Sequence, residues 1–221
     1  MITGASGNLG RAVAQAFAQL GARLVLLDLK NNEVEESETR LFLETNLFDA
    51  DSVEVVVKRA LERFGRIDVL CNIAGAFRMG PPVHETKDAD WNFLFDVNAR
   101  TVLRTARAVV PGMLKAGGGK IVNVGAYAAQ KGVAGMAAYI ASKSAVIRIT
   151  ETMAAELREK NINVNCVLPT IIDTPENRAA MPEADPRRWV APQDVAAVIL
   201  FLATDAARAV HGAAIPVTGL S

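Results

Sequence analysis

A tyrosine and a lysine lie four residues apart within residues 138–145, a stretch that has the pattern of a helix. One helical turn places Tyr139 and Lys143 on the same face. A phenol exchanges a proton with an alcohol or a ketone more readily when a neighbouring cation favours its ionised form, and Lys143 can be that cation. The pair alone is a weak signal, because most such pairs are a half-buried ring and a solvated amine. The elements that would position the pair must therefore support it.

The chain opens with a glycine-rich turn, in which Gly4, Gly7 and Gly10 follow Thr3 and lead into a helix predicted over residues 11–20. Glycines let the backbone approach a pyrophosphate closely, and the free N–H groups and the dipole of a helix start favour its negative charge. Glycine turns also occur in loops that bind nothing, so this motif depends on its context.

That context is a short apolar strand over residues 23–28, which ends in Asp28. A carboxylate about 20 residues after such a turn accepts hydrogen bonds from both hydroxyls of an adenosine ribose. The charge of Asp28 would repel a 2′-phosphate, which favours NAD(H) over NADP(H). Lys30 can offset part of this repulsion, so NADP(H) is not excluded.

Strands and helices alternate through the rest of the chain. Further strands are predicted at residues 41–46, 67–75, 119–124, 162–168 and 213–217, and further helices at 49–64, 88–110, 141–160 and 193–204. This order predicts an α/β fold: one domain over residues 1–221, with a Rossmann-like doubly wound parallel sheet of about seven strands and helices on both faces. The first strand is expected to be truncated, because only Met1 and Ile2 precede Thr3. Residues 31–39 are predicted to form a surface loop, and residues 170–190 a substrate lid.

The composition is that of an ordinary globular protein, with 221 residues, 51% hydrophobic and 22% charged. Basic and acidic residues both number 24, so the charge balance indicates neither nucleic acid nor a membrane surface as a partner. No apolar run is long enough to span a membrane and the start does not resemble a signal peptide, so we expect a cytoplasmic protein. Cys71 and Cys166 lie in apolar strands without ligand spacing, which predicts reduced, inert thiols and no metal site.

Together these motifs resemble the short-chain dehydrogenase/reductase family, and the resemblance runs from residue 2 to residue 219 in matching order. Thr3 with Gly4, Gly7 and Gly10 resembles the nucleotide-binding turn of the family, and Asn72-Ile73-Ala74-Gly75 resembles its Asn-Asn-Ala-Gly motif. Asn98 resembles its catalytic asparagine, and Tyr139 with Lys143 resembles its Tyr-x-x-x-Lys motif. Residues 169–174 resemble its Pro-Gly-x-Ile-x-Thr segment. Several motifs in register are far more specific than any one of them.

The resemblance implies roles for these residues. Tyr139 would donate or accept the proton, Lys143 would bind the nicotinamide ribose and lower the pKa of the tyrosine, and Asn98 would hold a water in the proton relay. The implied cofactor-binding residues are Gly4, Ser6, Gly7, Asn8, Leu9, Gly10, Asp28, Asn46, Leu47, Asn72, Ala74, Gly75, Tyr139, Lys143, Pro169, Ile172 and Thr174.

The implied activity is hydride transfer between NAD(P)(H) and a small carbonyl, alcohol or conjugated substrate, with NAD(H) preferred. Family members form dimers or tetramers through the helix that bears the tyrosine and the long helix before it. A homodimer or homotetramer is therefore expected by analogy.

Several positions depart from the family pattern. The catalytic serine of the family lies thirteen residues before the tyrosine, where this chain has Ala126, and Tyr127 could supply another hydroxyl. The glycines have the spacing of the longer family members, and Ile73 and Thr170 replace an asparagine and a glycine. The missing serine removes one hydrogen bond, of about 1–3 kcal/mol, from the transition state of carbonyl reduction.

The missing serine leaves two alternatives to carbonyl chemistry. One is reduction of a quinonoid dihydropteridine or a quinone, because quinonoid dihydropteridine reductase also lacks the serine and residues 74–80 loosely resemble its Ala-Gly-Gly-Trp segment. The other is a protein that binds the dinucleotide as a sensor or scaffold and turns over little. Ala126 and the short first strand favour this last hypothesis, whereas Tyr139, Lys143 and Asn98 count against it.

Overall fold

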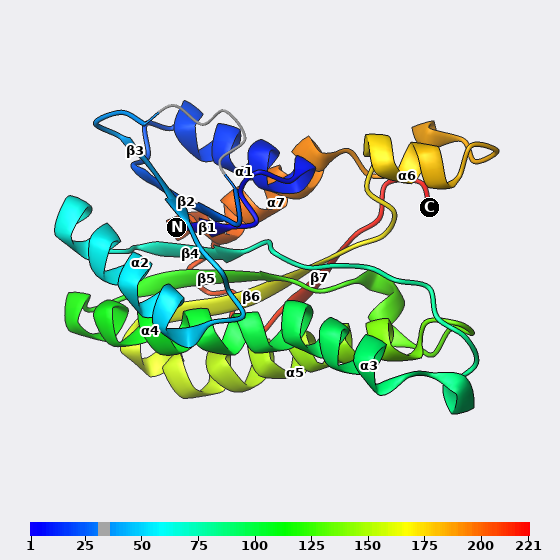
Figure 1. Cartoon of the computed structure of the whole chain (residues 1–221). Coiled ribbons are helices and arrows are strands. Elements are labelled where there is room, and N and C mark those ends of the chain that lie inside the picture. Colours follow the sequence, from blue (N-terminus) through cyan, green and yellow to red (C-terminus); the bar gives the residue numbers. More distant parts are fainter. Residues whose placement is uncertain (31–35) are drawn as a thin grey trace.

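One parallel sheet lies between two layers of helices in the computed structural model, which describes residues 1–30 and 36–221 (Figure 1). The sheet has seven strands in the order β3-β2-β1-β4-β5-β6-β7. All pairings between these strands are parallel. The chain therefore winds from the central β1 first to one edge and then to the other, and the predicted doubly wound fold is confirmed.

The strands are short and largely apolar on both faces. They are β1 (Ile2–Thr3), β2 (Leu24–Asp28), β3 (Arg40–Glu44), β4 (Val69–Asn72), β5 (Gly119–Val124), β6 (Ile162–Pro169) and β7 (Ala214–Val217). Successive side chains of β2 belong to opposite layers, because Leu26 packs in one hydrophobic cluster and Leu27 in the other. Burial on both faces explains why the strands appear in the sequence as continuous apolar runs.

The helices fall into the two layers that cover the sheet (Figure 1). One layer contains α1 (Asn8–Gln19) and α7 (Pro192–Leu202), and the other contains α2 (Ala50–Phe64), α4 (Thr101–Ala116) and α5 (Ala137–Leu157). Phe17 of α1 packs with Ile199 of α7 over the first face. Val57 of α2, Met113 of α4 and Met153 of α5 pack over the second.

The central strand β1 is the expected stub of two residues. Ile2 pairs with Leu26 of β2 and with Cys71 of β4. The Met1 ammonium continues this ladder by donating a hydrogen bond to the Val69 carbonyl at 2.8 Å. Its burial lowers the pKa of the ammonium.

Three helices differ from their predicted bounds by more than two residues. α1 begins at Asn8 rather than residue 11, because Gly7 already serves as its N-cap in an extended conformation. α5 begins at Ala137, so Tyr139 lies within its first turn. The predicted helix 88–110 consists of α3 (Asp88–Phe95), a π-helical turn (Asp96–Arg100) and α4, which accommodates Pro111 and ends only where Gly117 adopts φ 80°.

The remaining predictions concern loops and thiols. Residues 31–35 of the predicted surface loop lie outside the described residues. Residues 170–190 contain α6 (Pro175–Ala180) and a short 3₁₀ turn (Pro186–Arg188). The other 3₁₀ turns are Val83–Glu85, Tyr127–Gln130, Arg158–Lys160 and Asp205–Ala207.

Cys71 and Cys166 are free and buried, as predicted. None of the helices in the described ranges has the length and apolar character needed to cross a lipid bilayer.

Candidate active site

A cavity of about 520 Å³ lies at the carboxyl ends of the central strands. It is the size of a cofactor site and is found where doubly wound sheets bind their ligands. The cavity extends from the end of β2 past the glycine turn to the residues after β4. Its lining consists of Gly4, Gly7, Asn8, Leu9, Gly10, Asp28, Leu29, Thr45, Asn46, Leu47, Phe48, Ile73, Ala74, Gly75, Phe93, Val97, Thr101 and Thr174.

The glycine turn lines this cavity, and its tight backbone leaves no room for side chains at Gly4 and Gly10. Gly4 has φ +64°, and a Cβ there would lie 2.9 Å from the backbone of Ala74. A Cβ on Gly10 would collide with the Gly4 carbonyl. The turn can therefore bring its backbone N–H groups and the start of α1 close to an anion.

Asp28 stands at the end of β2 on the border of the cavity. Its Oδ2 accepts a hydrogen bond from the Ser6 backbone N–H at 2.8 Å, and its Oδ1 accepts one from the Leu29 N–H at 2.7 Å. These bonds fix the carboxylate beside the glycine turn. The Ser6 hydroxyl itself points elsewhere and donates to the Lys30 carbonyl at 3.0 Å.

Tyr139 projects from the first turn of α5 and is half-buried. The ring of Phe77 packs edge-on against it, with ring centroids 4.9 Å apart and planes at 87°. Burial raises the pKa of Tyr139 to about 12. This is the opposite of the lowered pKa that the sequence led us to expect, because burial disfavours the charged phenolate.

Lys143 lies one turn further along α5 and is buried. Its Nζ donates a hydrogen bond to the Val124 carbonyl at 2.8 Å. Burial lowers the pKa of its ammonium to about 8. The Nζ atom also lies 3.0 Å from the position that a Cβ on Gly75 would occupy, so the absence of that side chain lets the lysine reach the end of the cavity.

Asn98 belongs to the π-helical turn before α4 and is buried. Its Oδ1 accepts a hydrogen bond from the Ala76 N–H, and its Nδ2 donates to the Ala76 carbonyl, both at 3.0 Å. Nδ2 also donates to the Ser142 hydroxyl at 3.0 Å, which in turn donates to the Tyr139 carbonyl at 2.8 Å. The amide thus joins the loop after β4 to the turn of α5 that carries Tyr139.

Ala126 follows β5 and is only 4% exposed, within a small apolar cluster between α4 and α5. Tyr127, the alternative hydroxyl, is 42% exposed and begins the 3₁₀ turn Tyr127–Gln130. The extended backbone at Ala126, with φ −155° and ψ 142°, sends neighbouring side chains to opposite sides. Tyr127 is therefore not aligned with the side chain of Ala126.

A chain of buried polar side chains crosses the sheet beneath these residues. Thr105 of α4 donates to Asn72 Oδ1 at 2.8 Å, and Asn72 Nδ2 donates to Asn123 Oδ1 at 2.8 Å. Asn123 Nδ2 then donates to the Thr150 hydroxyl on α5 at 2.9 Å. This chain fixes α4, the sheet and α5 in register, and it uses the Asn72 side chain for positioning rather than for the cavity.

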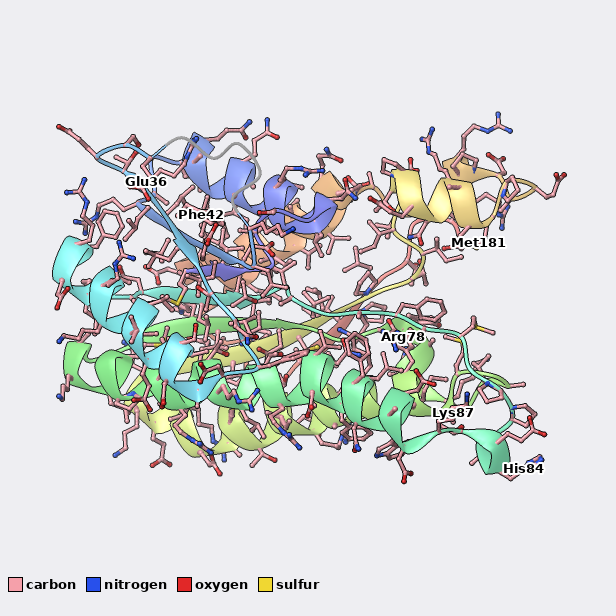
Figure 2. All side chains as sticks on the ribbon, viewed as in Figure 1. Glu36, Phe42, Arg78, His84, Lys87 and Met181 are labelled. Carbon is pink, nitrogen blue, oxygen red and sulfur yellow. The ribbon has the colours of Figure 1, made fainter. Side chains whose placement is uncertain are left out.

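Residues 170–190, the segment predicted to be a lid, follow β6 and contact the glycine turn through Glu176 and Asn8. Ile172 forms a β-bridge with Val190, and Thr174 caps α6 and lines the cavity. Arg178 forms a bidentate ion pair with Asp173 at 2.6 and 2.8 Å. In Figure 2 the labelled Met181 of this segment lies in the upper part of the view and Lys87, the residue before α3, in the lower part, with Arg78 at a height between them.

The structure therefore gathers most of the predicted cofactor residues in one place. Those that line the cavity are Gly4, Gly7, Asn8, Leu9, Gly10, Asp28, Asn46, Leu47, Ala74, Gly75 and Thr174, whereas Ser6, Asn72, Tyr139, Lys143, Pro169 and Ile172 do not. The sequence reasoning missed the aromatic residues Phe48, Phe77 and Phe93. Phe48 directly follows the predicted Asn46-Leu47 pair, but the loop position of Phe77 gave no periodic signal. Among the described residues there is no group of three or more potential metal ligands.

A glycine turn at the switch point of a 3-2-1-4-5-6-7 parallel sheet defines the Rossmann class of nucleotide-binding folds. A family model described as enoyl-(acyl carrier protein) reductase matches residues 4–219. The 3-oxoacyl-(acyl-carrier-protein) reductase FabG of Thermotoga maritima is 36% identical over 236 residues, which cover 99% of this chain and 95% of that protein. The chain belongs to the short-chain dehydrogenase/reductase family.

Solved structures agree with this assignment. A structure described as NAD⁺-bound xylitol dehydrogenase has a TM-score of 0.90 and 28% identity, covering 99% of this chain and 96% of that one. A structure described as ElxO with NADP bound has a TM-score of 0.91 and 25% identity, with the same coverage of both chains.

Proposed function

We propose that this protein is a nicotinamide-dinucleotide-dependent oxidoreductase that interconverts a carbonyl compound and the corresponding alcohol, an activity of the class EC 1.1.1. The observation that carries the proposal is the convergence at Gly75. Asn98 Oδ1 and Lys143 Nζ lie 2.9 and 3.0 Å from the position of a Cβ there, where the cavity ends. Tyr139 lies one turn before Lys143 on the same helix, and its carbonyl is linked to Asn98 through the Ser142 hydroxyl.

The cofactor fits the cavity by size and by chemistry. The glycine turn and the start of α1 would hold the pyrophosphate, Asp28 the adenosine ribose, and Asn46 with Leu47 the adenine. Lys143 would hold the nicotinamide ribose, with Ala74, Gly75, Pro169, Ile172 and Thr174 around the nicotinamide end. Relatives include both an NAD-bound and an NADP-bound structure. The carboxylate of Asp28 supports a preference of this chain for NAD(H).

Bound NADH supplies a hydride, which carries two electrons to the carbonyl carbon. Tyr139 supplies the proton that the carbonyl oxygen needs, so that C=O becomes CH–OH and the phenol becomes a phenolate. With its pKa raised to about 12, the phenol stays protonated at neutral pH and is available as the acid. In the reverse direction the phenolate form of Tyr139 accepts the hydroxyl proton of the alcohol. Asn98 holds Ala76 and, through Ser142, the backbone of Tyr139 in place for this transfer.

The names of the relatives favour carbonyl and alcohol chemistry over pteridine or quinone reduction, since they describe an oxoacyl reductase and a polyol dehydrogenase. Ala126 predicts weaker polarisation of the carbonyl than in a serine-containing relative. Residues 170–190 are proposed to close over the substrate. By analogy with the family, α4 and α5 are proposed to form the interface of a homodimer or homotetramer.

The test compares turnover and cofactor binding in two tyrosine variants. Tyr139→Phe should reduce NADH-dependent ketone reduction by at least about 10²-fold, the usual contribution of a general acid. Calorimetric affinity for NADH should change little, because the cavity lining is intact. Tyr127→Phe, the matched substitution at the other tyrosine, should retain most of the turnover. Equal loss in both variants, or none in Tyr139→Phe, would remove Tyr139 from the proposed mechanism.

A further inference from the structure

The aromatic ring of Phe77 is in an unusual place for a large apolar side chain. It is 54% exposed, in the loop that follows β4. Its ring nevertheless contacts the proposed proton donor, with the centroids of Phe77 and Tyr139 4.9 Å apart in an edge-to-face arrangement. One side of the ring thus faces the reacting phenol while much of the rest remains open to solvent.

The loop is anchored on the N-terminal side of Phe77. The preceding residue, Ala76, exchanges backbone hydrogen bonds with the buried amide of Asn98, both at 3.0 Å. Asn98 is itself held by Ser142 of α5. This anchor ties the position of Phe77 to the same helix that carries Tyr139.

The loop is also anchored on the C-terminal side. The guanidinium of Arg78 stacks over the Phe93 ring, 3.8 Å from its centroid, and pairs with Asp90 at 3.0 Å. The Gly80 N–H donates to the Gly135 carbonyl at 2.7 Å and so joins the loop to the residues before α5. Arg78 is therefore turned toward α3, and the loop is fixed on both sides of Phe77.

Other apolar side chains are exposed in the loops that precede α3 and α5. Met79 is exposed, and its terminal methyl lies 3.1 Å from the position of a Cβ on Gly135. Val133, in the loop before α5, is exposed as well. Ala126 stands where a relative would place a hydroxyl. An exposed, fixed aromatic ring in such surroundings gains most from contact with an apolar group.

We propose that Phe77 is a specificity-determining residue, whose open face binds an apolar, preferably cyclic or aromatic, substituent on the alcohol or ketone whose oxygen meets Tyr139. The inference rests on the proposed function and narrows its substrate class. A polyol in the same position would place hydroxyl groups against the ring without partners, which is unfavourable. The site therefore discriminates against polyols and in favour of flat apolar substrates.

A kinetic experiment uses 1-phenylethanol and xylitol as probes with NAD⁺. The wild type should oxidise 1-phenylethanol with the higher kcat/KM. Phe77→Ala should lower that kcat/KM by about tenfold, mainly through KM, which corresponds to about 1.4 kcal/mol of lost binding. Phe77→Leu should restore part of the loss. Phe201→Ala, which removes a similarly exposed ring (45%) from α7, should behave as wild type.

A binding experiment separates this inference from the proposed function, because it needs no turnover. Saturation-transfer NMR with acetophenone, with and without NAD⁺, should show transfer to the phenyl protons in the wild type and in Phe201→Ala. The transfer should be lost in Phe77→Ala at an unchanged melting temperature. The inference would be overturned by equal transfer in wild type and Phe77→Ala or by a wild type that does not bind acetophenone. A kinetic preference of the wild type for xylitol would also overturn it. Absence of turnover with intact, Phe77-dependent acetophenone binding would instead count against the proposed function alone.

Discussion

Asn8, at the start of α1, donates a hydrogen bond from Nδ2 to Oε2 of Glu176 in α6 at 2.8 Å. This contact joins the glycine turn to segment 170–190, the proposed lid. The guanidinium of Arg11 supports it, because NH2 donates to Asn8 Oδ1 at 2.8 Å and NH1 donates to the Ser6 carbonyl at 2.7 Å. Hydrogen bonds from its own backbone N–H and from Thr174 are the main cause of the lowered pKa of Glu176, and the Asn8 hydrogen bond and the Arg11 charge add smaller contributions.

Glu176→Ala should loosen the lid. Because the contact is exposed, we expect amide hydrogen exchange in residues 175–181 to accelerate only roughly two- to fivefold, the range for a surface ion pair or hydrogen bond. Glu183→Ala, on the same segment but outside this contact, is the matched control. Mass-spectrometric exchange that is identical in Glu176→Ala and wild type would show that Asn8 does not restrain the lid.

Asp28→Asn should change the cofactor preference. The substitution removes the charge but keeps an oxygen that can accept the hydrogen bond of the Ser6 N–H. Loss of the repulsion should raise the affinity for NADPH relative to NADH by about tenfold, the equivalent of about 1.4 kcal/mol. The measurement is calorimetric titration with both cofactors.

Glu44→Gln provides the control for this change of preference. Glu44 pairs with Asp28 in the register of β2 and β3 but does not line the cavity. Its substitution should leave the NADH-to-NADPH affinity ratio unchanged. A wild type that prefers NADPH would refute the role assigned to Asp28.

Ala126→Ser should increase ketone reduction, because the new hydroxyl would lie at the position from which the family polarises the carbonyl. A hydrogen bond of about 1–3 kcal/mol in the transition state corresponds to a rise in kcat/KM of roughly five- to 150-fold. Ala129→Ser, another buried alanine in the adjoining 3₁₀ turn, should give no gain. If Ala126→Ser also gives none, the substrate does not need a polarised carbonyl at this point.

Lys143→Met should stabilise the fold at neutral pH while it abolishes turnover. Burial lowers the pKa of the Lys143 ammonium from 10.5 to about 8, so the unfolded chain binds this proton more tightly than the folded protein does. The contribution of the neutral amine to the free energy of unfolding is fully present above pH 10.5, and it is lost as the pH falls through about 8. Below pH 8 the variant should therefore exceed the wild type by about 3 kcal/mol in free energy of unfolding.

The pH dependence provides the control for this prediction. Burial also raises the pKa of Cys71 to about 12 and that of Cys166 to about 11, so both proteins lose stability in alkali. Taking the difference between wild type and variant at each pH removes most of this shared effect. The difference in urea-unfolding free energy should shrink between pH 8 and pH 10.5. A difference that stays constant with pH would contradict a buried ammonium at Lys143.

Local patterns were sufficient to predict most of the architecture. Apolar runs separated by helix-length segments predicted the parallel sheet, and Asp49 and Gly65 predicted the limits of α2 because they act as its N-cap and its left-handed C-cap. Boundaries were less certain where backbone geometry decides them. Gly7 started α1 earlier than the spacing suggested, and α4 continued through Pro111 to Gly117.

The sequence by itself determined which residues could bind a dinucleotide or transfer a proton, since glycine spacing, the strand-end carboxylate Asp28 and the Tyr139-Lys143 turn are local features. Only the tertiary structure decided their environment. The pKa of Tyr139 rises because segments distant in sequence exclude water from it, and Phe77 meets Tyr139 because Asn98 and Arg78 anchor a loop 62 positions away. Solvation and contacts between distant segments depend on packing in three dimensions, which residue spacing alone does not specify.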